Sequence, residues 1–591
     1  MPTAILTGQP VPGSSIEGDL RSLGFEVRSA ADPADAESLL AQVPGDRRVA
    51  VVDARFVGHL HALRLGLTDP RFPLAAIPGA VTAQPAGRRA LTHALVRETA
   101  APGALLVDSL ADRIAGALDA DVHRPELGSL VAAVPADPQA RNEARQAVTA
   151  VDDEAVRLKS AVKARDGFFT TFFISPYSRY IARWCARRGL TPNQVTTASL
   201  LTALIAAGCA ATGTRGGFVA AGVLLIASFV LDCTDGQLAR YSLQYSTLGA
   251  WLDATFDRAK EYAYYAGLAL GAARGGDDVW ALALGAMVLQ TCRHVVDFSF
   301  TEANHDATAN TSPTAALSGR LDGVGWTVWL RRMIVLPIGE RWALIAVLTA
   351  VTTPRVTFSV LLVGCAFAAA YTTAGRVLRS LTRGAARTDR AARALADLAD
   401  SGPLVAPLAR AVPVPAPLSA GAGALLVVIS AALWGAAWPT LLAALGSVAL
   451  SAAAVSRPLE GALDWLVPPF FRAAEYGTVL ILAAESEVNG ALPAAFGLVA
   501  AVAYHHYDTV YRIRGGAGAP PRRLVRAIGG HEGRTLVVVV LAVVLTAAQF
   551  TAALTVLAVA VALVVLLESI RFWVSAHRQG APAVHDEGEP A

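Results

Sequence analysis

Long apolar runs separated by short polar loops fill the chain from about residue 190 onward, whereas the first 150 residues contain no such run. Because about 20 apolar residues cross the hydrocarbon core of a bilayer, this pattern predicts a mainly α-helical, polytopic membrane protein. Six spans are expected near 195–213, 217–238, 248–273, 278–299, 341–353 and 356–377. About six more are expected near 419–437, 439–456, 469–485, 490–508, 534–550 and 552–575.

The same pattern sets the expected domain boundaries. Residues 151–194 precede the first span and interleave aromatic residues with arginines, which predicts a linker and an interfacial amphipathic helix. The predicted order is a small soluble α/β domain (1–150), this linker (151–194), a first membrane domain (195–381), an Arg/Ala/Pro-rich linker (382–417), a second membrane domain (418–577) and a tail (578–591).

Composition supports this division and excludes some functions. Hydrophobic residues make up 54% of the chain and charged residues 16%, which is too apolar for an ordinary soluble protein of this size. The net charge is only +3, so nothing indicates a nucleic-acid partner. The five cysteines show no metal-binding spacing and are expected to be free buried thiols.

Clusters of arginine predict the orientation of the spans. One cluster precedes the first span and another follows the sixth: Arg179, Arg183, Arg187 and Arg188, then Arg376, Arg379, Arg383, Arg387 and Arg390. By the positive-inside rule both clusters lie in the cytoplasm, which agrees with an even number of spans. The N-terminus has no basic-then-apolar leader, so we expect the soluble domain on the same side of a cell (plasma) membrane.

The chemistry is concentrated in one motif of the first membrane domain, D-x2-D-G-x2-A-R-x8-G-x3-D-x3-D. Its eight positions are Asp232, Asp235, Gly236, Ala239, Arg240, Gly249, Asp253 and Asp257. An aspartate at the centre of a membrane helix costs about 2.5–3.5 kcal/mol, so four of them need a functional reason. Bound cations would offset that cost.

The spacing within the motif indicates a metal site. Asp232 and Asp235 are three residues apart and Asp253 and Asp257 four, so each pair projects from one helix face. A turn between the helices would bring together four carboxylates, which are ligands for Mg²⁺ or Mn²⁺ rather than zinc. The glycines and Ala239 leave room for a ligand against the backbone, and Arg240 offers a forked cation for phosphate.

These eight residues resemble the signature of the CDP-alcohol phosphotransferase (CDP-alcohol phosphatidyltransferase) family of integral membrane enzymes, and the resemblance covers about 165–380. It implies attack of an alcohol hydroxyl on the β-phosphorus of a CDP-linked donor, with release of CMP. It further implies that Asp232, Asp235 and Asp253 hold two metal ions and that Asp257 completes the site and acts as general base. Gly236, Ala239, Arg240 and Gly249 would line the CDP pocket.

The resemblance leaves the substrates open. The broad role of the family in phospholipid biosynthesis favours CDP-diacylglycerol as donor, with an alcohol such as inositol phosphate as acceptor. A soluble donor of the CDP-inositol type is the alternative. Arg293 and Arg376 are candidates for binding an acceptor phosphate, although arginines at span ends more often set topology. Asn193 and Thr196 are candidates for donor contacts, or parts of a helix cap.

Other functions remain as alternatives. Twelve spans with intramembrane acids could form a transporter, but a proton path does not require the spacing of the motif. An inactive scaffold is the third reading, and the complete set of aspartates disfavours it. The expected partners are membrane lipid, a CDP-linked donor and an alcohol acceptor, and a homodimer is allowed for.

The N-terminal region alternates strand-like segments with helix-like ones. The strand-like segments are Ala4–Thr7, Phe25–Arg28 and Arg48–Asp53, and the βαβαβ order predicts a parallel sheet. A nucleotidyltransferase-like domain would resemble known fusions, but the loop 8–13 lacks a Gly-rich basic cradle. A receiver-like domain would use Asp53, but Gly8 and Gln9 stand in place of its acidic pair. We therefore expect a degenerate regulatory or docking domain.

Two polar clusters mark the second membrane domain, within Phe470–Tyr476 and Tyr504–Arg512. The second contains His505 and His506, which as neighbours face different sides of a helix and suit a shared metal poorly. We interpret it as an interfacial girdle of aromatic and charged residues. A second polar site facing the cytoplasm is the alternative.

Overall fold

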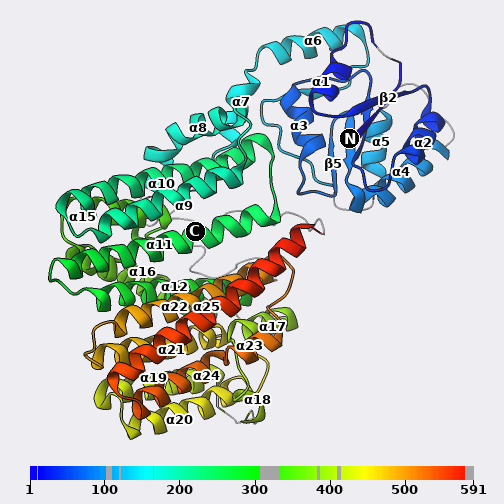
Figure 1. Ribbon diagram of the computed structural model, residues 1–591. Helices are drawn as coiled ribbons and strands as arrows, with labels where there is room; N and C mark the ends of the chain where they lie inside the picture. Colours follow the sequence, from blue (N-terminus) through cyan, green and yellow to red (C-terminus); the bar gives the residue numbers. More distant parts are fainter. Residues whose placement is uncertain are drawn as a thin grey trace.

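The computed structural model describes residues 1–9, 11–100, 109–118, 122–163, 166–305, 329, 333–382, 387–408 and 414–578. The predicted tail therefore lies almost wholly outside the described residues, as do parts of the linker predicted at 382–417. Figure 1 shows an N-terminal α/β domain joined through α6 (Pro138–Thr149) and α7 (Asp153–Ser160) to a large helical part.

A five-stranded sheet with strand order β2-β1-β3-β6-β5 forms the centre of the N-terminal domain. The strands β1 (Thr3–Thr7), β2 (Glu26–Ala30) and β3 (Val49–Asp53) are parallel, as predicted. The strands β5 (Leu74–Ile77) and β6 (Ala80–Ala83) form a hairpin, and β6 pairs antiparallel with β3. The sheet is therefore mixed rather than wholly parallel.

Helices cover both faces of this sheet because successive strand residues point to opposite sides. Ile5, Val49 and Val51 pack toward α2 (Pro33–Gln42), α4 (Arg88–Ala100) and α5 (Leu110–Ala117). Leu6 and Val52 pack on the other face, toward α1 (Ile16–Ser22) and α3 (Leu60–Thr68). Buried on both faces, these strands are continuous apolar runs.

Asp53 ends β3, as the sequence predicted, and its carboxylate is engaged locally. It accepts hydrogen bonds from the backbone N–H of Arg55 at 2.8 Å and from the Arg55 guanidinium at 2.9 and 3.1 Å. Only 3% of Asp53 is exposed. The arrangement gives Asp53 a structural role at the strand end, and the two predicted readings of the domain stay predictions.

A helix covers each of the twelve predicted spans. The first six are α9 (Pro192–Ala211), α10 (Arg215–Ser242), α11 (Thr247–Arg274), α12 (Trp280–Ala303), α15 (Ile338–Val351) and α16 (Pro354–Thr382). The second six are α19 (Ala416–Trp434), α20 (Trp438–Ala454), α21 (Val467–Glu485), α22 (Ala491–Arg514), α24 (Gly530–Val544) and α25 (Ala547–Arg578). Between the two sets lie α17 (Asp389–Leu398) and α18 (Val405–Leu408), and α23 (Arg522–Ala527) precedes α24.

Seven segments of the described chain are long and apolar enough to cross a membrane by length and composition, which makes this a multi-pass membrane protein. They contain α9, α10, α16, α19, α21, α24 and α25. Of the others, α15 and α20 are short, with 14 and 17 residues. The helices α11, α12 and α22 are long enough, but their sequences include charged residues that the fold buries.

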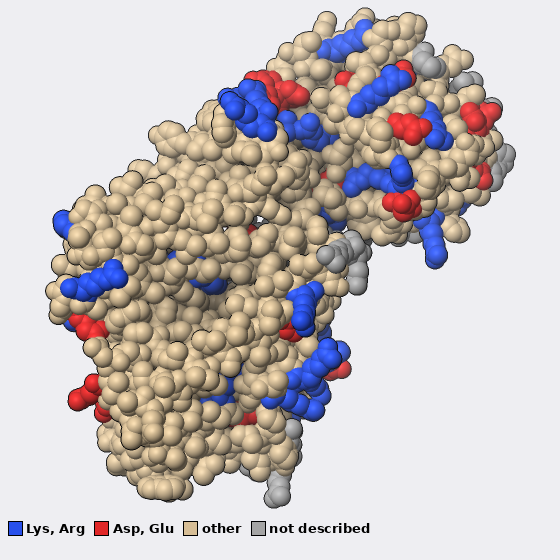
Figure 2. Space-filling model, in the orientation of Figure 1, with Lys and Arg blue, Asp and Glu red and all other residues tan. Residues whose placement is uncertain are grey.

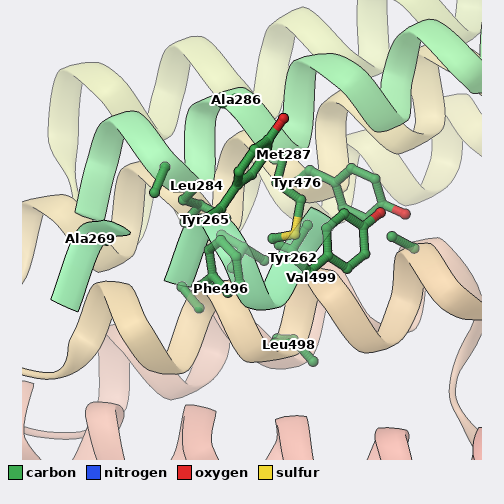
Figure 3. Packing of buried hydrophobic residues seen from close by; sticks show 14 of the residues in the cluster. Tyr262, Tyr265, Ala269, Leu284, Ala286, Met287, Tyr476, Phe496, Leu498 and Val499 are labelled. Atoms are coloured by element: carbon green, nitrogen blue, oxygen red, sulfur yellow. The ribbon is translucent and has the colours of Figure 1, made fainter. Parts of the chain in front are cut away.

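The two membrane domains share one apolar core. Figure 3 shows Tyr262 and Tyr265 of α11 and Met287 of α12 close to Tyr476 of α21 and Phe496 of α22. Within the first domain, α9 and α11 pack so closely that a Cβ on Gly267 would clash with the backbone carbonyl oxygen of Ala207. Because residues of α11 and α12 share a core with residues of α21 and α22, the two membrane domains form one body.

The distribution of charge agrees with this division. Figure 2 shows that on this face Lys, Arg, Asp and Glu gather over the N-terminal domain and the margins of the helical part, and most of the helical surface lacks them. The helix α8 (Ser175–Arg187) exposes 69% of Tyr177, 45% of Tyr180 and 52% of Trp184. Such an aromatic face is typical of the predicted interfacial helix.

The prediction of an interfacial girdle at Tyr504–Arg512 is wrong. His505, His506, Asp508 and Arg512 are each no more than 2% exposed, because α22 packs against α12, α21 and α25. His505 Nε2 lies 3.2 Å from the carboxylate of Asp400, while the His506 ring lies 6.4 Å from that of Phe298. The adjacent histidines therefore face different sides, as the spacing predicted.

Candidate active site

The end of α10 and the start of α11 form the frame of the candidate site. Leu243, with φ of 53° in the left-handed region, ends α10 and turns the chain. Ser246 caps α11 by accepting a hydrogen bond from the Gly249 N–H at 2.9 Å. The two halves of the acidic motif thus lie on antiparallel neighbouring helices, as the eight-residue spacing predicted.

Three of the four aspartates converge. Asp232, Asp235 and Asp253 each offer a carboxylate oxygen, and these oxygens lie within 4.8 Å of one another. It is the one group of metal-ligating side chains found among the described residues. Oδ2 of Asp235 is buried and has no hydrogen-bond partner in the described chain. A buried, unpartnered anionic oxygen beside two more carboxylates fits a hard cation such as Mg²⁺ or Mn²⁺.

Asp257 lines the same space but has a different partner. Its Oδ1 lies 2.8 Å from Nζ of Lys260, and the same ammonium forms an ion pair with Asp232. The side chain of Lys260 is fully buried, and its Nζ also donates to the hydroxyl of Ser199 at 3.2 Å. Lys260 therefore supplies a built-in countercharge to two of the motif carboxylates, which offsets part of the cost of placing them inside the protein.

Lys260 was not singled out from the sequence. The available signal was its ionisable side chain within an apolar helix, three residues after Asp257. A charged residue in a membrane span is a candidate functional residue by default, because burial there is costly. Its partners depend on how α9, α10 and α11 pack, and the sequence does not give that packing directly.

A cavity of about 280 Å³ unites the motif. All eight motif positions line it: Asp232, Asp235, Gly236, Ala239, Arg240, Gly249, Asp253 and Asp257. The structure thus brings together every residue of the motif. Their individual roles remain predictions.

The glycines of the motif have distinct reasons to be glycine. A Cβ on Gly236 would approach only the guanidinium group of Arg240, with its nitrogens at 3.6 Å. Without a side chain, Gly236 leaves this space in the cavity free for a ligand. A Cβ on Gly249 would lie 2.8 Å from Asn193 Oδ1 and 2.9 Å from Ser246 Oγ, closer than real contacts allow. Gly249 therefore permits the close approach of α9 and α11.

Residues outside the motif complete the cavity wall. Asn193 and Thr196 of α9 line it, whereas the cap of that helix is Thr191, which forms a capping box with Gln194. The reading of Asn193 as a helix cap is therefore wrong. Further lining residues that sequence reasoning missed are Lys163 and Asp166 from the segment after α7, and Arg71 from the N-terminal domain.

Arg293 and Arg376 do not line this cavity. Arg293 is buried in α12 and donates to the carbonyl oxygen of Val335. Arg376 forms an ion pair with Asp297, and its guanidinium lies 5.5 Å from the centre of the Phe300 ring. Both contacts hold helices together, which favours the structural reading of these arginines.

Beneath the cavity, a second layer of buried charge supports α11. The Glu261 carboxylate accepts from Arg258 at 2.9 Å and from Arg341 of α15 at 3.2 Å. Tyr265 donates to the same carboxylate at 2.8 Å. Because Glu261 follows Lys260 directly, these bonds fix the turn of helix that carries both Lys260 and Asp257.

Comparisons with known proteins agree with the location of this site. A family described as CDP-alcohol phosphatidyltransferase matches residues 189–369, which contain the whole motif. A family of unknown function (DUF5941) matches residues 389–591, the second membrane domain.

Individual relatives match parts of the chain. A phosphatidylinositol phosphate synthase of Streptomyces avermitilis is 36% identical over 131 residues, 21% of this chain and 51% of the relative. An archaetidylinositol phosphate synthase of Pyrococcus horikoshii is 31% identical over 113 residues, 19% of this chain and 58% of the relative. A bifunctional IPC transferase and DIPP synthase of Aquifex aeolicus is 28% identical over 210 residues, 35% of this chain and 46% of the relative. The chain spans about half the length of these curated relatives.

Proposed function

We propose that this protein, whose residues 189–369 match the CDP-alcohol phosphatidyltransferase family, transfers a substituted phosphate group from a CDP-linked donor to an alcohol and releases CMP. The observation that carries the proposal is the convergence of Asp232, Asp235 and Asp253 in a cavity lined by all eight motif residues. Buried polar groups usually have hydrogen-bond partners, and among the described residues Asp235 Oδ2 has none, which supports a ligand at this cluster.

The proposed reaction is a displacement at the β-phosphorus of the donor. A bond forms between the acceptor oxygen and phosphorus, the bond from phosphorus to the bridging oxygen breaks, and CMP leaves with that electron pair. The hydroxyl proton passes to a carboxylate, for which we propose Asp257. Such transfers depend on positioning and on stabilising charge more than on covalent catalysis.

Divalent cations bound by Asp232, Asp235 and Asp253 would neutralise charge on the entering and leaving oxygens. The protein itself holds the carboxylates apart from bulk water, between α9, α10 and α11. Lys260, together with the hydrogen bonds that Glu261 accepts, keeps Asp257 in place. Arg240 lies beside Gly236, where it can meet a phosphate oxygen. We propose a site of two metal ions, with Asp257 completing it.

We propose CDP-diacylglycerol as donor and inositol phosphate as acceptor. The relatives of Streptomyces avermitilis and Pyrococcus horikoshii, whose names are those of inositol phosphate lipid synthases, support this choice. A donor of the CDP-inositol type is the second candidate, supported by the longer match to the bifunctional relative of Aquifex aeolicus.

We further propose that the site opens to the cytoplasm of a plasma membrane. The N-terminal domain lies on the same side as the cavity, since Arg71 contributes to its wall. The basic clusters that flank the first six spans support this orientation, because positive charge favours the cytoplasmic side. The second membrane domain shares the core of the first and is proposed to support it; a homodimer stays a prediction.

The test is a substrate panel with protein reconstituted in vesicles. CDP-diacylglycerol and CDP-inositol are offered in turn with Mn²⁺, each with inositol phosphate, glycerol phosphate or serine. The proposal expects a lipid product from CDP-diacylglycerol and inositol phosphate. Turnover of CDP-inositol alone would establish the second candidate, and release of CMP from neither donor would contradict both.

A further inference from the structure

One loop of the N-terminal domain reaches the cavity of the membrane domain. It joins α3 to β5 and contains Arg71, whose Cζ lies 4.0 Å from the centre of the Tyr245 ring. Tyr245 belongs to the turn between α10 and α11, which carries the two halves of the acidic motif. Arg71 and Tyr245 both line the cavity that contains the aspartates. The soluble domain thus contributes directly to the wall of the candidate active site.

The loop is built to hold Arg71 in one position. The Asp69 carboxylate accepts from Arg71 Nη2 at 2.7 Å, from Nε at 3.1 Å and from the backbone N–H at 3.0 Å. Gln84 donates from its side chain to the carbonyl oxygens of Pro70 at 2.8 Å and Phe72 at 2.6 Å. Arg48 donates to the carbonyl oxygen of Asp69 at 2.9 Å. A side chain held this firmly loses little entropy when it meets a ligand.

Two further cations come from different segments of the chain. Lys163 lies after α7, in the segment that leads from the N-terminal domain to the membrane, and it lines the cavity. Arg240 of α10 donates from Nε to the carbonyl oxygen of Ala161 at 2.6 Å, which ties α10 to this segment. Arg71, Lys163 and Arg240 are the three cationic side chains among the described residues that line the cavity.

The charge of the cavity explains why more than one cation is needed there. Five carboxylates line it: Asp166, Asp232, Asp235, Asp253 and Asp257. Lys260 compensates two of the motif carboxylates, and bound metal ions would compensate the others. A substrate that carries two phosphoryl groups would still bring several negative charges into the same space. Arginine suits such a group because its planar fork donates two parallel hydrogen bonds to phosphoryl oxygens.

We propose that Arg71, supported by Lys163, forms a phosphoryl-binding subsite through which the N-terminal domain completes the substrate site of the membrane domain. The ligand chemistry is a phosphoryl oxygen, from the donor's pyrophosphate or from a phosphate on the acceptor. The inference rests on the proposed function and adds to it: the soluble domain takes part in selecting the substrate.

The test compares Arg71→Gln with Arg28→Gln in the full-length protein. Arg28 is a matched control because it also belongs to the N-terminal domain and pairs with an acid two residues before it, Glu26 at 2.8 Å, but does not line the cavity. We expect Arg71→Gln to raise one KM by about tenfold or more, since a lost hydrogen bond to a charged group weakens binding by that factor. We expect Arg28→Gln to change neither KM.

The two KM values identify the source of the phosphoryl group. A higher donor KM alone assigns the subsite to the pyrophosphate, and a higher acceptor KM alone assigns it to the acceptor phosphate. Arg71→Lys, which keeps the charge but loses the fork, should fall between the wild type and Arg71→Gln. Equal KM values in the wild type and Arg71→Gln would overturn the inference while leaving the proposed function intact.

A binding measurement keeps the inference testable without turnover. Titration calorimetry with inorganic pyrophosphate and Mn²⁺ should show binding to the wild type and to Arg28→Gln, and binding at least about tenfold weaker to Arg71→Gln. Equal thermal unfolding of the two variants would show that Arg71→Gln is folded, and if it unfolds earlier the comparison moves to Lys163→Gln. Equal affinity, or no binding by the wild type, would overturn the inference.

Discussion

Nζ of Lys260 lies 2.8 Å from Oδ1 of Asp257 and also pairs with Asp232, so one buried ammonium joins both halves of the acidic motif. The pair links α10 to α11 at the base of the cavity. It also means that the carboxylates proposed to serve the reaction are held by a fixed cation before any metal binds. The stability of Lys260 variants and the activity of Asp257 variants both depend on this ion pair.

Replacing Lys260 with Met should destabilise the metal-free protein by about 3–5 kcal/mol, because buried carboxylates lose their partner. Mn²⁺ should stabilise this variant more than the wild type, since the ion can replace the lost positive charge. Thermal unfolding in detergent with and without Mn²⁺ measures both effects, with Lys260→Arg as the charge-preserving control. Equal stability of Lys260→Met and wild type in metal-free buffer would contradict the assignment.

Asp257→Asn tests the proposed base while the three converging aspartates stay in place. We expect it to lower CMP release by roughly 10²–10⁴-fold, the usual contribution of a positioned base. Because the cluster of Asp232, Asp235 and Asp253 is left intact, Mn²⁺ should still raise the unfolding temperature. Asp253→Asn should lose both activity and the Mn²⁺ effect. Full activity of Asp257→Asn would remove Asp257 from the mechanism.

Gly249→Ala tests the packing that shapes the cavity. The added Cβ would lie 2.8 Å from Asn193 Oδ1, so the asparagine side chain must move and activity should fall. Asn193→Ala in the same chain removes that clash and should restore part of the packing. Unfolding temperatures of the single and double variants give the coupling between the two positions. Additive effects would show that the two residues do not meet.

The N-terminal domain should lose stability in mild acid because of His61. Burial, together with the nearby Arg157 and Arg64 guanidiniums, lowers the pKa of His61 to about 4. Unfolding frees the imidazole to titrate near its ordinary 6.5, so the unfolded state binds more protons between these values. Stability is therefore constant above about pH 6.5 and falls by about 3 kcal/mol as the pH drops to about 4.

Hydrogen exchange of the β1 and β3 amides as a function of pH measures this effect. His61 is 4% exposed, and neither ring nitrogen has a hydrogen-bond partner among the described residues. His61→Leu should therefore keep the fold and flatten the pH dependence between pH 6.5 and 4. An unchanged pH dependence in this variant would show that another group is responsible.

A buried network in the second membrane domain should be essential to its fold. Asp400 accepts hydrogen bonds from Arg472 at 3.0 Å, from Arg534 at 2.6 Å and, with its other oxygen, lies 3.2 Å from His505. Burial alone would raise the pKa of Asp400, but the Arg534 and Arg472 guanidiniums hold this pKa well below its usual range. Asp400→Asn should destabilise the protein by about 3–5 kcal/mol.

The pH dependence of that loss has a defined sign. Because the folded pKa of Asp400 is depressed, its contribution is present above the unfolded value near 3.9 and disappears as the pH falls further. The difference between wild type and Asp400→Asn should thus be constant from pH 5 to pH 8. A difference that changes across this range, in unfolding measured by denaturant, would contradict the network assignment.

The acidic motif could be predicted from sequence because its geometry is local. Spacings of three and four residues place Asp232 beside Asp235 and Asp253 beside Asp257 on any helix. Lys260 could not be assigned in the same way, since its partners depend on how α10 and α11 both pack against α9. Arg71 could not be predicted as a residue of the site, because it belongs to another domain and reaches the cavity beside Tyr245 through the fold alone.

In the second membrane domain, too, the packing of the helices could not be predicted from the sequence. The helices there were predictable from long apolar runs, but the position of Tyr504–Arg512 was not. Aromatic and charged residues near the end of a span usually lie at the membrane interface. Here His505, Asp508 and Arg512 are buried. Their partners are distant in sequence: Asp400 for His505, Trp573 for Asp508 and Glu568 for Arg512.

The most direct test of the account is release of CMP by the purified full-length protein from CDP-diacylglycerol and inositol phosphate. The wild type and Asp253→Asn are compared in the same lipid, with Mn²⁺ and with a chelator. We expect the wild type to release CMP only with Mn²⁺ and Asp253→Asn to release none. Both proteins should unfold cooperatively, which shows that the variant is folded. Release that persists in the chelator, or in Asp253→Asn, would contradict the claim that this acidic cavity is the active site.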